Sequence, residues 1–328
     1  MIFKVEWEKT RARVRLSDEL FLGLLSTYYR EKNAIKSVSI IEGGCSNINV
    51  LVHLNRSSDP VILRIHLQAP CSGYKEEKIA SLLQGILPIP KYYHIGKALG
   101  YTFSIIEYLP GQALSQLLLN SSPSDFSKIM FKVGQALGTC TSIKFPSAGL
   151  FDHNLEITEC ASPKHVVNFC LQCLEDANVN SVLTREQKEK IKLIFTLYID
   201  LLPTFAETNL VHADFDPANI LVTEKNGEIE ISGIIDWEFA FAGSPLWDVA
   251  NMLRYAHQMP ENFQVSFLQG LQSTDYHLPG TWQTTVHLLN ITSLLDCLKR
   301  SDQKTQPKQI RDIKNLISHI LDAKCWSQ

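Results

Sequence analysis

A predicted hairpin over residues 220–235 restricts the architecture of this chain more than any other segment. Its turn is the pair Asn226 and Gly227, which lies between two apolar runs and favours a two-residue type I′ connection. Centring the turn there places Asn219 opposite Ile234, with Asp236 just beyond. At about 3.3 Å per residue along a strand, Asn219 and Asp236 come close enough to share one Mg²⁺ ion, which prefers oxygen ligands.

A third polar side chain, Asp214, lies on the loop that leads into this hairpin. It is placed to orient a substrate hydroxyl and accept its proton. The order His-x-Asp-x-x-x-x-Asn, followed by a hairpin and an acid, is typical of phosphoryl-transfer enzymes. Asp and Asn are also common in ordinary turns, but that explains single residues and not the ordered set. His212 fits a hydrogen-bonded structural role as well as a catalytic one, so we assign it no catalytic role.

The segment departs from protein kinases in two places. Asp236, Trp237 and Glu238 stand in place of Asp-Phe-Gly, and His-Ala-Asp stands in place of His-Arg-Asp. In these features it resembles the aminoglycoside phosphotransferase and choline kinase family of small-molecule kinases, over about residues 41–255. The resemblance implies an α+β, two-lobed protein-kinase-like fold. We expect a nucleotide-binding lobe with a small antiparallel sheet over residues 1–108 and a mainly helical catalytic lobe over residues 109–328.

The first lobe shows a helix and three strands. A helix is predicted from the N-cap Ser17 onward, and strands over residues 37–41, 49–54 and 61–67. The loop between the first two strands contains a Gly-Gly-x-Ser-Asn sequence that could bring backbone N–H groups against phosphate oxygens, although ordinary hairpin loops share this composition. The candidate residues there are Gly43, Gly44, Ser46 and Asn47.

The third strand, VILRIHL, has a cation in the middle of an apolar run. The resemblance implies that this residue, Arg64, contacts the α- and β-phosphates and is held by a glutamate on the following helix, predicted over residues 74–84. Glu76 precedes the apolar positions of that helix by three, four and seven residues, so it points inward and is preferred over Glu77. The arginine provides a bidentate fork suited to phosphate.

A turn at Leu109-Pro110-Gly111 separates the lobes. By resemblance, backbone groups from Glu107 to Leu109 bind the adenine edge, although a plain β-turn explains the sequence equally well. Asp248 resembles the family's acid that anchors the catalytic loop, and it is also compatible with an ordinary acid in the first turn of a helix. Helices are predicted over residues 126–141, 165–176, 185–201, 246–255, 265–271, 281–298 and 307–321.

Composition excludes several other classes. Lys plus Arg number 31 against 34 Asp plus Glu, without a basic stripe, which argues against nucleic acid as a partner. The eight cysteines lack the spacing of a disulfide framework, and the Cys170-x-x-Cys173 pair is interpreted as core packing on a helix. Charges interrupt the apolar runs, including those at the start of the sequence, so we expect no membrane partner and a cytoplasmic protein.

These residues predict an enzyme that uses ATP and Mg²⁺ to phosphorylate a hydroxyl of a small molecule. Asp216 and Glu238 could meet a cationic acceptor, which favours an aminoglycoside-like or other amino-bearing substrate. The alternatives are a kinase for choline, homoserine or a sugar-type metabolite, and a non-catalytic nucleotide-binding protein. A protein kinase is disfavoured because the sequence lacks the G-x-G-x-x-G, Asp-Phe-Gly and Ala-Pro-Glu motifs.

Overall fold

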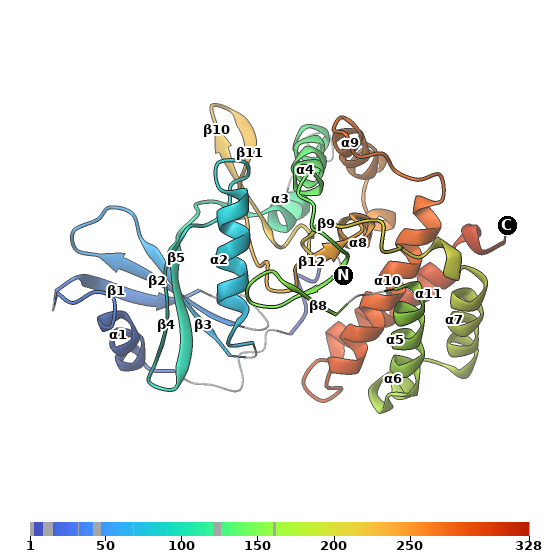
Figure 1. The fold of residues 1–328 in the computed structure, drawn as a ribbon, viewed down its shortest axis with the longest axis horizontal. Coiled ribbons are helices and arrows are strands. Elements are labelled where there is room, and N and C mark those ends of the chain that lie inside the picture. The colour runs from blue at the N-terminus through green and yellow to red at the C-terminus, as the bar shows by residue number, and fades with distance from the viewer. Residues whose placement is uncertain are drawn as a thin grey trace.

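The computed structural model describes residues 3–8, 16–31, 33–41, 47–67, 69–120, 126–159 and 162–327. Its smaller lobe is built on a five-stranded antiparallel sheet with strand order β1-β2-β3-β5-β4 (Figure 1). The strands are β1 (Ile35–Ile40), β2 (Asn47–Leu54), β3 (Val61–His66), β4 (Tyr92–Ala98) and β5 (Tyr101–Glu107). All six residues of β3 are buried, because this strand is central and covered on both faces.

Two helices flank this sheet. In α1 (Asp18–Ser26), the predicted N-cap Ser17 accepts a hydrogen bond from the backbone N–H of Leu20, and Phe21, Leu24 and Leu25 pack into a core shared with β2, β3 and β5. The other helix, α2 (Ser72–Leu83), buries Glu76 on the same side as its apolar residues and contributes to the larger core of the protein. It therefore connects the sheet to the second lobe.

The predicted hairpin is present as β10 (Ile220–Lys225) and β11 (Glu228–Ile234), with β6 (Gln112–Ala113) on its outer side. Asn226 and Gly227 both have positive φ, as a type I′ turn requires. The predicted register holds near the turn, but a bulge in β11 shifts it by one residue farther along. The prediction that Asn219 faces Ile234 is therefore wrong. Asn219 lies opposite Ile235, whose N–H donates to its carbonyl at 3.0 Å, and Asp236 follows directly.

A third, four-stranded sheet lies next to the loops that enter and leave the hairpin. Its strand order is β8-β7-β12-β9, with β7 (Gly149–Phe151), β8 (Ile157–Glu159), β9 (Asn209–Val211) and β12 (Phe241–Gly243). Because β9 ends just before His212 and β12 begins shortly after Asp236, their pairing holds the two ends of this segment together.

The second lobe is mainly helical, as predicted. Its helices are α3 (Leu114–Asn120), α4 (Phe126–Thr141), α5 (Pro163–Glu175), α6 (Ala177–Val182), α7 (Arg185–Leu197), α8 (Leu246–Leu253), α9 (Glu261–Gln272), α10 (Trp282–Arg300) and α11 (Pro307–Leu321). Short 3-10 turns add Ile199–Leu201, Ala256–Gln258 and Lys324–Ser327. The short helices α3 and α6 were not predicted, whereas α4 and α11 have the predicted bounds. On α5, Cys170 and Cys173 are buried, which confirms their packing role.

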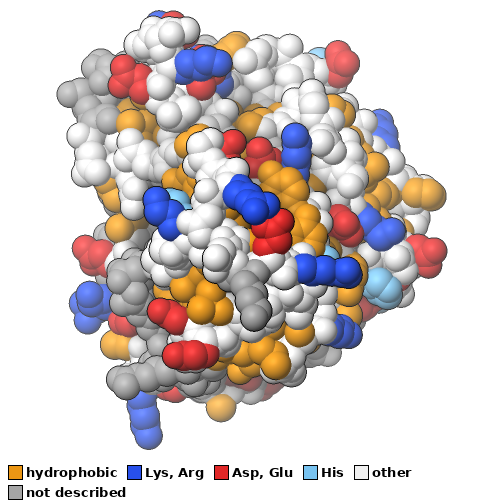
Figure 2. Space-filling model, turned by 90° about the vertical axis from the view of Figure 1, so that its left-hand side faces the viewer, with side chains coloured by type: hydrophobic (Ala, Val, Ile, Leu, Met, Phe, Trp, Pro, Cys, Tyr) orange, Lys and Arg blue, Asp and Glu red, His pale blue; other side chains and the backbone are white. Residues whose placement is uncertain are grey.

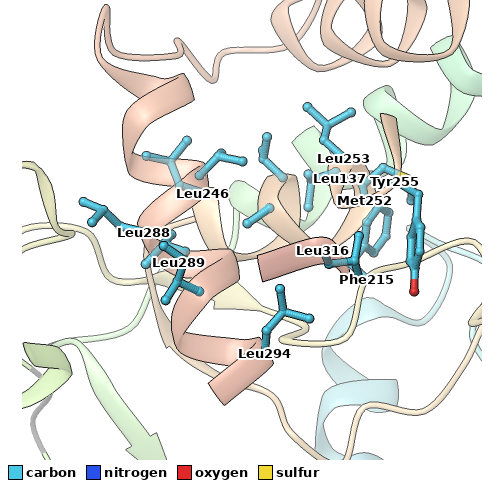
Figure 3. Close-up of a cluster of buried hydrophobic side chains, with 14 of the residues drawn as sticks. Leu137, Phe215, Leu246, Met252, Leu253, Tyr255, Leu288, Leu289, Leu294 and Leu316 are labelled. Carbon is cyan, nitrogen blue, oxygen red and sulfur yellow. The ribbon is translucent and has the colours of Figure 1, made fainter. Parts of the chain in front are cut away.

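The core of this lobe extends up to the loop that carries Asp214 and Asn219. Figure 3 shows leucines of α4, α8, α10 and α11 in one buried cluster with the side chain of Phe215. Phe215 is fully buried although it lies between two acids on a loop. Burying a phenylalanine side chain is worth about 2–3 kcal/mol, so this residue anchors the loop to the helices.

The first described residues lie on the helical lobe, which differs from their assignment to the N-terminal lobe. The ring of Phe3 packs against those of Tyr255 and Phe263, with centroids 5.7 and 5.9 Å away. On the outer face of the small lobe, cationic, anionic and apolar side chains are interspersed (Figure 2). Within the described ranges, no helix combines the length and apolar character needed to cross a bilayer.

Candidate active site

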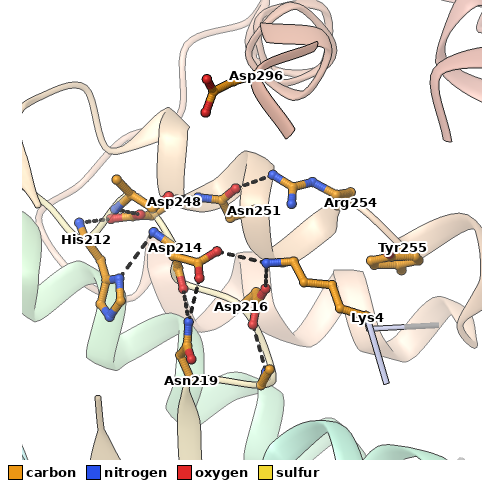
Figure 4. Close-up of polar contacts among 12 residues, drawn as sticks. Lys4, His212, Asp214, Asp216, Asn219, Asp248, Asn251, Arg254, Tyr255 and Asp296 are labelled. Carbon is orange, nitrogen blue, oxygen red and sulfur yellow. Dashed lines mark hydrogen bonds and ion pairs between the residues drawn. The ribbon is translucent and has the colours of Figure 1, made fainter. Parts of the chain in front are cut away.

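The two residues of the predicted catalytic loop, Asp214 and Asn219, contact each other. The Nδ2 group of Asn219 donates to the backbone carbonyl of Asp214 and to its Oδ2, both at 2.9 Å (Figure 4). The amide nitrogen is therefore directed at Asp214, and the amide oxygen is turned away from it. The Asp214 side chain keeps 26% of its surface exposed, so an acceptor hydroxyl can reach it.

A buried acid binds the backbone of this loop. Asp248, on the first turn of α8, accepts hydrogen bonds from the backbone N–H groups of His212 at 2.7 Å and Ala213 at 2.8 Å. Burial raises the pKa of the Asp248 carboxyl to about 7, although these amide donors oppose the shift. Its predicted anchoring role is thus supported by two direct contacts.

The loop is held in a strained conformation. Ala213 has a φ of 69°, which non-glycine residues seldom adopt. Asn251 donates to its carbonyl at 2.8 Å, one turn of α8 beyond Asp248. Strain of this kind persists where surrounding contacts determine the backbone, so Asp248 and Asn251 together fix the direction in which Asp214 points.

The His212 side chain links this loop to the end of the hairpin. It is fully buried, its Nδ1 accepts the Asp214 N–H at 3.2 Å, and its Nε2 donates to the Ile235 carbonyl at 3.0 Å. Its ring packs on Trp237, with centroids 4.3 Å apart. Burial lowers the pKa of His212, so the neutral imidazole acts as a bridge between the loop and the end of the hairpin.

On the opposite side of the site, the predicted cation and its glutamate form a buried cluster with Asp236. The Nη2 of Arg64 lies 2.5 Å from Asp236 Oδ1 and 3.6 Å from Glu76 Oε1. Tyr92 donates to Glu76 Oε2 at 2.7 Å, a contact that the sequence did not predict. Burial raises the pKa of Glu76 to about 7, while the guanidinium of Arg64 opposes the shift. The cluster joins β3 and α2 to the end of the hairpin.

The remaining predicted nucleotide-binding residues are only partly described. Gly43, Gly44 and Ser46 lie outside the described residues. Asn47, at the start of β2, donates to Glu238 Oε2 at 3.0 Å. Glu107 ends β5, pairing with Val61 at the edge of the small lobe. Leu109 follows it, with a side chain close to Gly233 of the hairpin.

The oxygen groups at the hairpin end suit Mg²⁺ bound together with a nucleotide. Asp236 offers a carboxylate that is 31% exposed, and Asn219 offers its amide oxygen. Across the described ranges, no cluster of three or more His, Cys, Asp or Glu side chains forms a metal site. Mg²⁺ typically keeps one or two protein oxygens and completes its shell with phosphates and water. In addition, the buried Nε of Arg64 has no hydrogen-bond partner among the described residues, and a phosphate oxygen would provide one.

The two acids that we expected to face a cationic acceptor are engaged within the protein. Glu238 is buried near Asn47 and Arg64, on the nucleotide side. Asp216 is also buried, accepts the Ala218 N–H at 2.8 Å, and forms an ion pair with Lys4. Their proximity in sequence to Asp214 and Asp236 does not determine the direction in which their side chains point.

Lys4 also lies at the site, although no sequence motif indicates it. Its Nζ lies 2.9 Å from Asp214 Oδ1 and also contacts Asp216 Oδ2 (Figure 4). Burial alone would raise the pKa of Asp214, but the Lys4 ammonium lowers it to about 2. Lys4 and Asp214 lie 210 positions apart in the sequence and share no motif. No local sequence pattern could therefore predict their contact.

The fold and the site define a two-lobed, kinase-like phosphotransferase. Residues 37–282 match the model of the phosphotransferase enzyme family. The chain therefore belongs to this family, which agrees with the resemblance found from the catalytic loop.

Solved structures show the same fold. Aminoglycoside phosphotransferase APH(4)-Ia superposes with a TM-score of 0.72 at 16% identity, covering 93% of this chain and 98% of that one. Spectinomycin phosphotransferase APH(9)-Ia, in complex with ADP and spectinomycin, gives a TM-score of 0.63 at 14% identity, covering 94% and 99%. At these identities the similarity establishes the fold alone, and it confirms the predicted α+β architecture.

A curated relative is acyl-CoA dehydrogenase family member 11 of Pongo abelii, 25% identical over 182 residues. The match covers 54% of this chain and 22% of that protein. The chain thus matches about a fifth of the length of this relative.

Proposed function

We propose that this protein transfers the γ-phosphoryl group of ATP to a hydroxyl of a small amino-bearing acceptor. The observation that carries the proposal is the convergence of Asp214, Asn219 and Asp236 at the open end of one hairpin, with Arg64 directed at the same place from the other lobe. Phosphoryl transfer depends mainly on positioning and on neutralising charge, and this arrangement provides both.

Each group has a role that follows from its contacts. Asp214, fixed by Asn219 and partly exposed, orients the acceptor hydroxyl and takes its proton. Arg64 binds phosphate oxygens, and backbone groups of Glu107 to Leu109 bind the adenine edge. Asn219 and Asp236 would hold Mg²⁺, which neutralises charge on the phosphates when bound. The glycines and Ser46 preceding Asn47 would approach the phosphates from the β1–β2 loop.

An amino-bearing acceptor is supported by the solved structures whose names include aminoglycosides and spectinomycin. The acids Asp216 and Glu238 no longer support it, because each is paired inside the protein.

The test is ADP release from MgATP by the purified protein, with aminoglycosides, spectinomycin, macrolides, choline, homoserine and sugars as separate acceptors. Acceptor-dependent turnover by one of the amino-bearing compounds would support the proposal. Turnover with a neutral sugar alone would show that the acceptor is not amino-bearing. MgATP binding without turnover on any compound would favour a non-catalytic nucleotide-binding protein, and absence of MgATP binding would contradict the proposal as a whole.

Replacing Arg64 with lysine is expected to weaken MgATP binding about tenfold, because lysine keeps the charge but loses the planar fork and its hydrogen bonds to phosphate. The measurement is the MgATP dissociation constant by titration calorimetry. Arg56→Lys is the matched control, since the Arg56 side chain is 80% exposed on a turn of the same lobe. An unchanged affinity in Arg64→Lys would show that Arg64 only pairs with acids such as Glu76 and does not bind the nucleotide.

A further inference from the structure

The segment of residues 3–8 lies on the helical lobe, with Lys4 beside the loop of Asp214 and Glu8 at the start of α11. It lies outside the part of the chain that matches the family model, residues 37–282, and so does α11. These two segments are bound to each other. The indole N–H of Trp7 donates to Asp312 at 2.8 Å, and the Glu8 carboxylate accepts the backbone N–H groups of Lys308 and Gln309 at the start of α11.

The same segment is anchored by its apolar residue. Phe3 is 3% exposed and belongs to the main core, where it packs on Tyr255 and Phe263. Phe3 and Lys4 both have φ values near +60°, in the left-handed region that non-glycine residues seldom adopt. Strained backbone persists where side-chain contacts determine it. The segment is therefore packed into the helical lobe, and the side chain of its residue Lys4 points at the catalytic loop.

Lys4 provides the second side-chain partner of the Asp214 carboxylate. One carboxylate oxygen of Asp214 accepts from Asn219 and the other pairs with Lys4, so each oxygen has its own partner. Lys4 also pairs with Asp216, two residues along the loop. Without this ammonium, two carboxylates would face each other in a mostly buried loop, where like charges repel strongly. Asp214 would then be expected to turn toward solvent.

We propose that Lys4 is a positioning residue for phosphoryl transfer, which holds the Asp214 carboxylate in the orientation that receives the acceptor hydroxyl. The proposal rests on the proposed function and adds to it a residue from outside the family-matched region. Lys4 acts through Asp214, and the Phe3, Trp7 and Glu8 contacts set the position of its side chain.

The first test is steady-state kinetics with the acceptor that gives the fastest turnover in the panel above, or with water as acceptor if none does. We expect Lys4→Met to lower kcat by about 10- to 100-fold, because small misplacements of a catalytic group have effects of this size. The MgATP dissociation constant should stay within about twofold, since Arg64 and Asp236 are untouched. Lys4→Arg should restore most of the rate, because it restores the charge. Lys36→Met, at an exposed position of β1, is the control.

Three kinetic outcomes would overturn the proposal. An unchanged kcat in Lys4→Met would show that Asp214 is held without the lysine. A raised kcat would show instead that residues 3–8 obstruct the acceptor. An equal loss in Lys4→Met and Lys4→Arg, together with a lowered melting temperature in both, would show that Lys4 contributes to stability alone.

A second measurement does not depend on turnover, so it separates failure of this inference from failure of the proposed function. Amide hydrogen exchange of residues 212–219 should be several-fold faster in Lys4→Met than in Lys36→Met. Val5→Ala, at an exposed position of the same segment, should leave the exchange unchanged, whereas Phe3→Ala should accelerate it. Unchanged exchange in both Lys4→Met and Phe3→Ala would overturn the inference even if the protein proves to be a kinase.

Discussion

Replacing Asp214 with asparagine is expected to lower kcat for phosphoryl transfer by about 10³-fold, within the usual contribution of a general base. Asparagine has nearly the same shape and keeps an oxygen for the Asn219 amide, but it cannot take a proton from the acceptor. MgATP affinity should change by no more than about twofold, because the contacts of Arg64 and Asp236 lie on the other side of the site. The measurement is ADP release with and without acceptor, alongside calorimetric binding of MgATP.

Asp275→Asn is the control for this variant, because Asp275 is exposed on the connection between α9 and α10. Full activity in Asp214→Asn would remove Asp214 from the chemistry. A loss of MgATP binding equal to the loss of rate would assign Asp214 to the nucleotide instead of the acceptor.

The second large effect is expected at Asp248, where alanine should lower the free energy of unfolding by about 2–5 kcal/mol. The variant leaves two buried backbone N–H groups, those of His212 and Ala213, without their acceptors, and each such group costs about 1–3 kcal/mol. Asp248→Asn retains one acceptor oxygen and should lose about half as much. Denaturant unfolding of the purified variants measures both values, and activity should fall with them because Ala213 precedes Asp214.

The matched control is Glu261→Ala, which removes an exposed acid from the first turn of α9. An acid that only complements the helix dipole contributes about 0.3–1 kcal/mol. If Asp248→Ala is no more destabilising than Glu261→Ala, then Asp248 is an ordinary first-turn acid and the loop is held by other contacts.

The local features of this site could be predicted from the sequence because they arise from short-range geometry. The five-residue spacing from Asp214 to Asn219 closes one loop, and the Asn-Gly turn sets the tip of the hairpin. Glu76 was selected from helical spacing alone, and it lies buried beside Arg64. In contrast, the bulge in β11 lies beside Gly233, a residue type that indicates bulges inside strands, and a register counted from the turn alone is one position off at Asn219.

Long-range contacts account for what the sequence did not reveal. Tyr92 meets Glu76 through the packing of β4 on α2, and Asn251 meets Ala213 because α8 passes beneath the loop. Asp216 and Glu238 were assigned to the acceptor because they lie next to catalytic residues in the chain, yet both turn inward. The direction of such a side chain depends on how both lobes pack, and no local sequence pattern indicates it.

The contacts between residues 3–8 and α11 have a consequence for how the protein is made. Lys4 and Trp7 lie on one segment, and Trp7 is synthesised 305 residues before Asp312, the acid that it binds. At about 5–20 residues per second, roughly 15 to 60 seconds separate the two. During this interval a nascent chain can already have a folded nucleotide lobe and a complete catalytic loop, but Asp214 still lacks its lysine. Catalytic competence would then wait for the docking of α11.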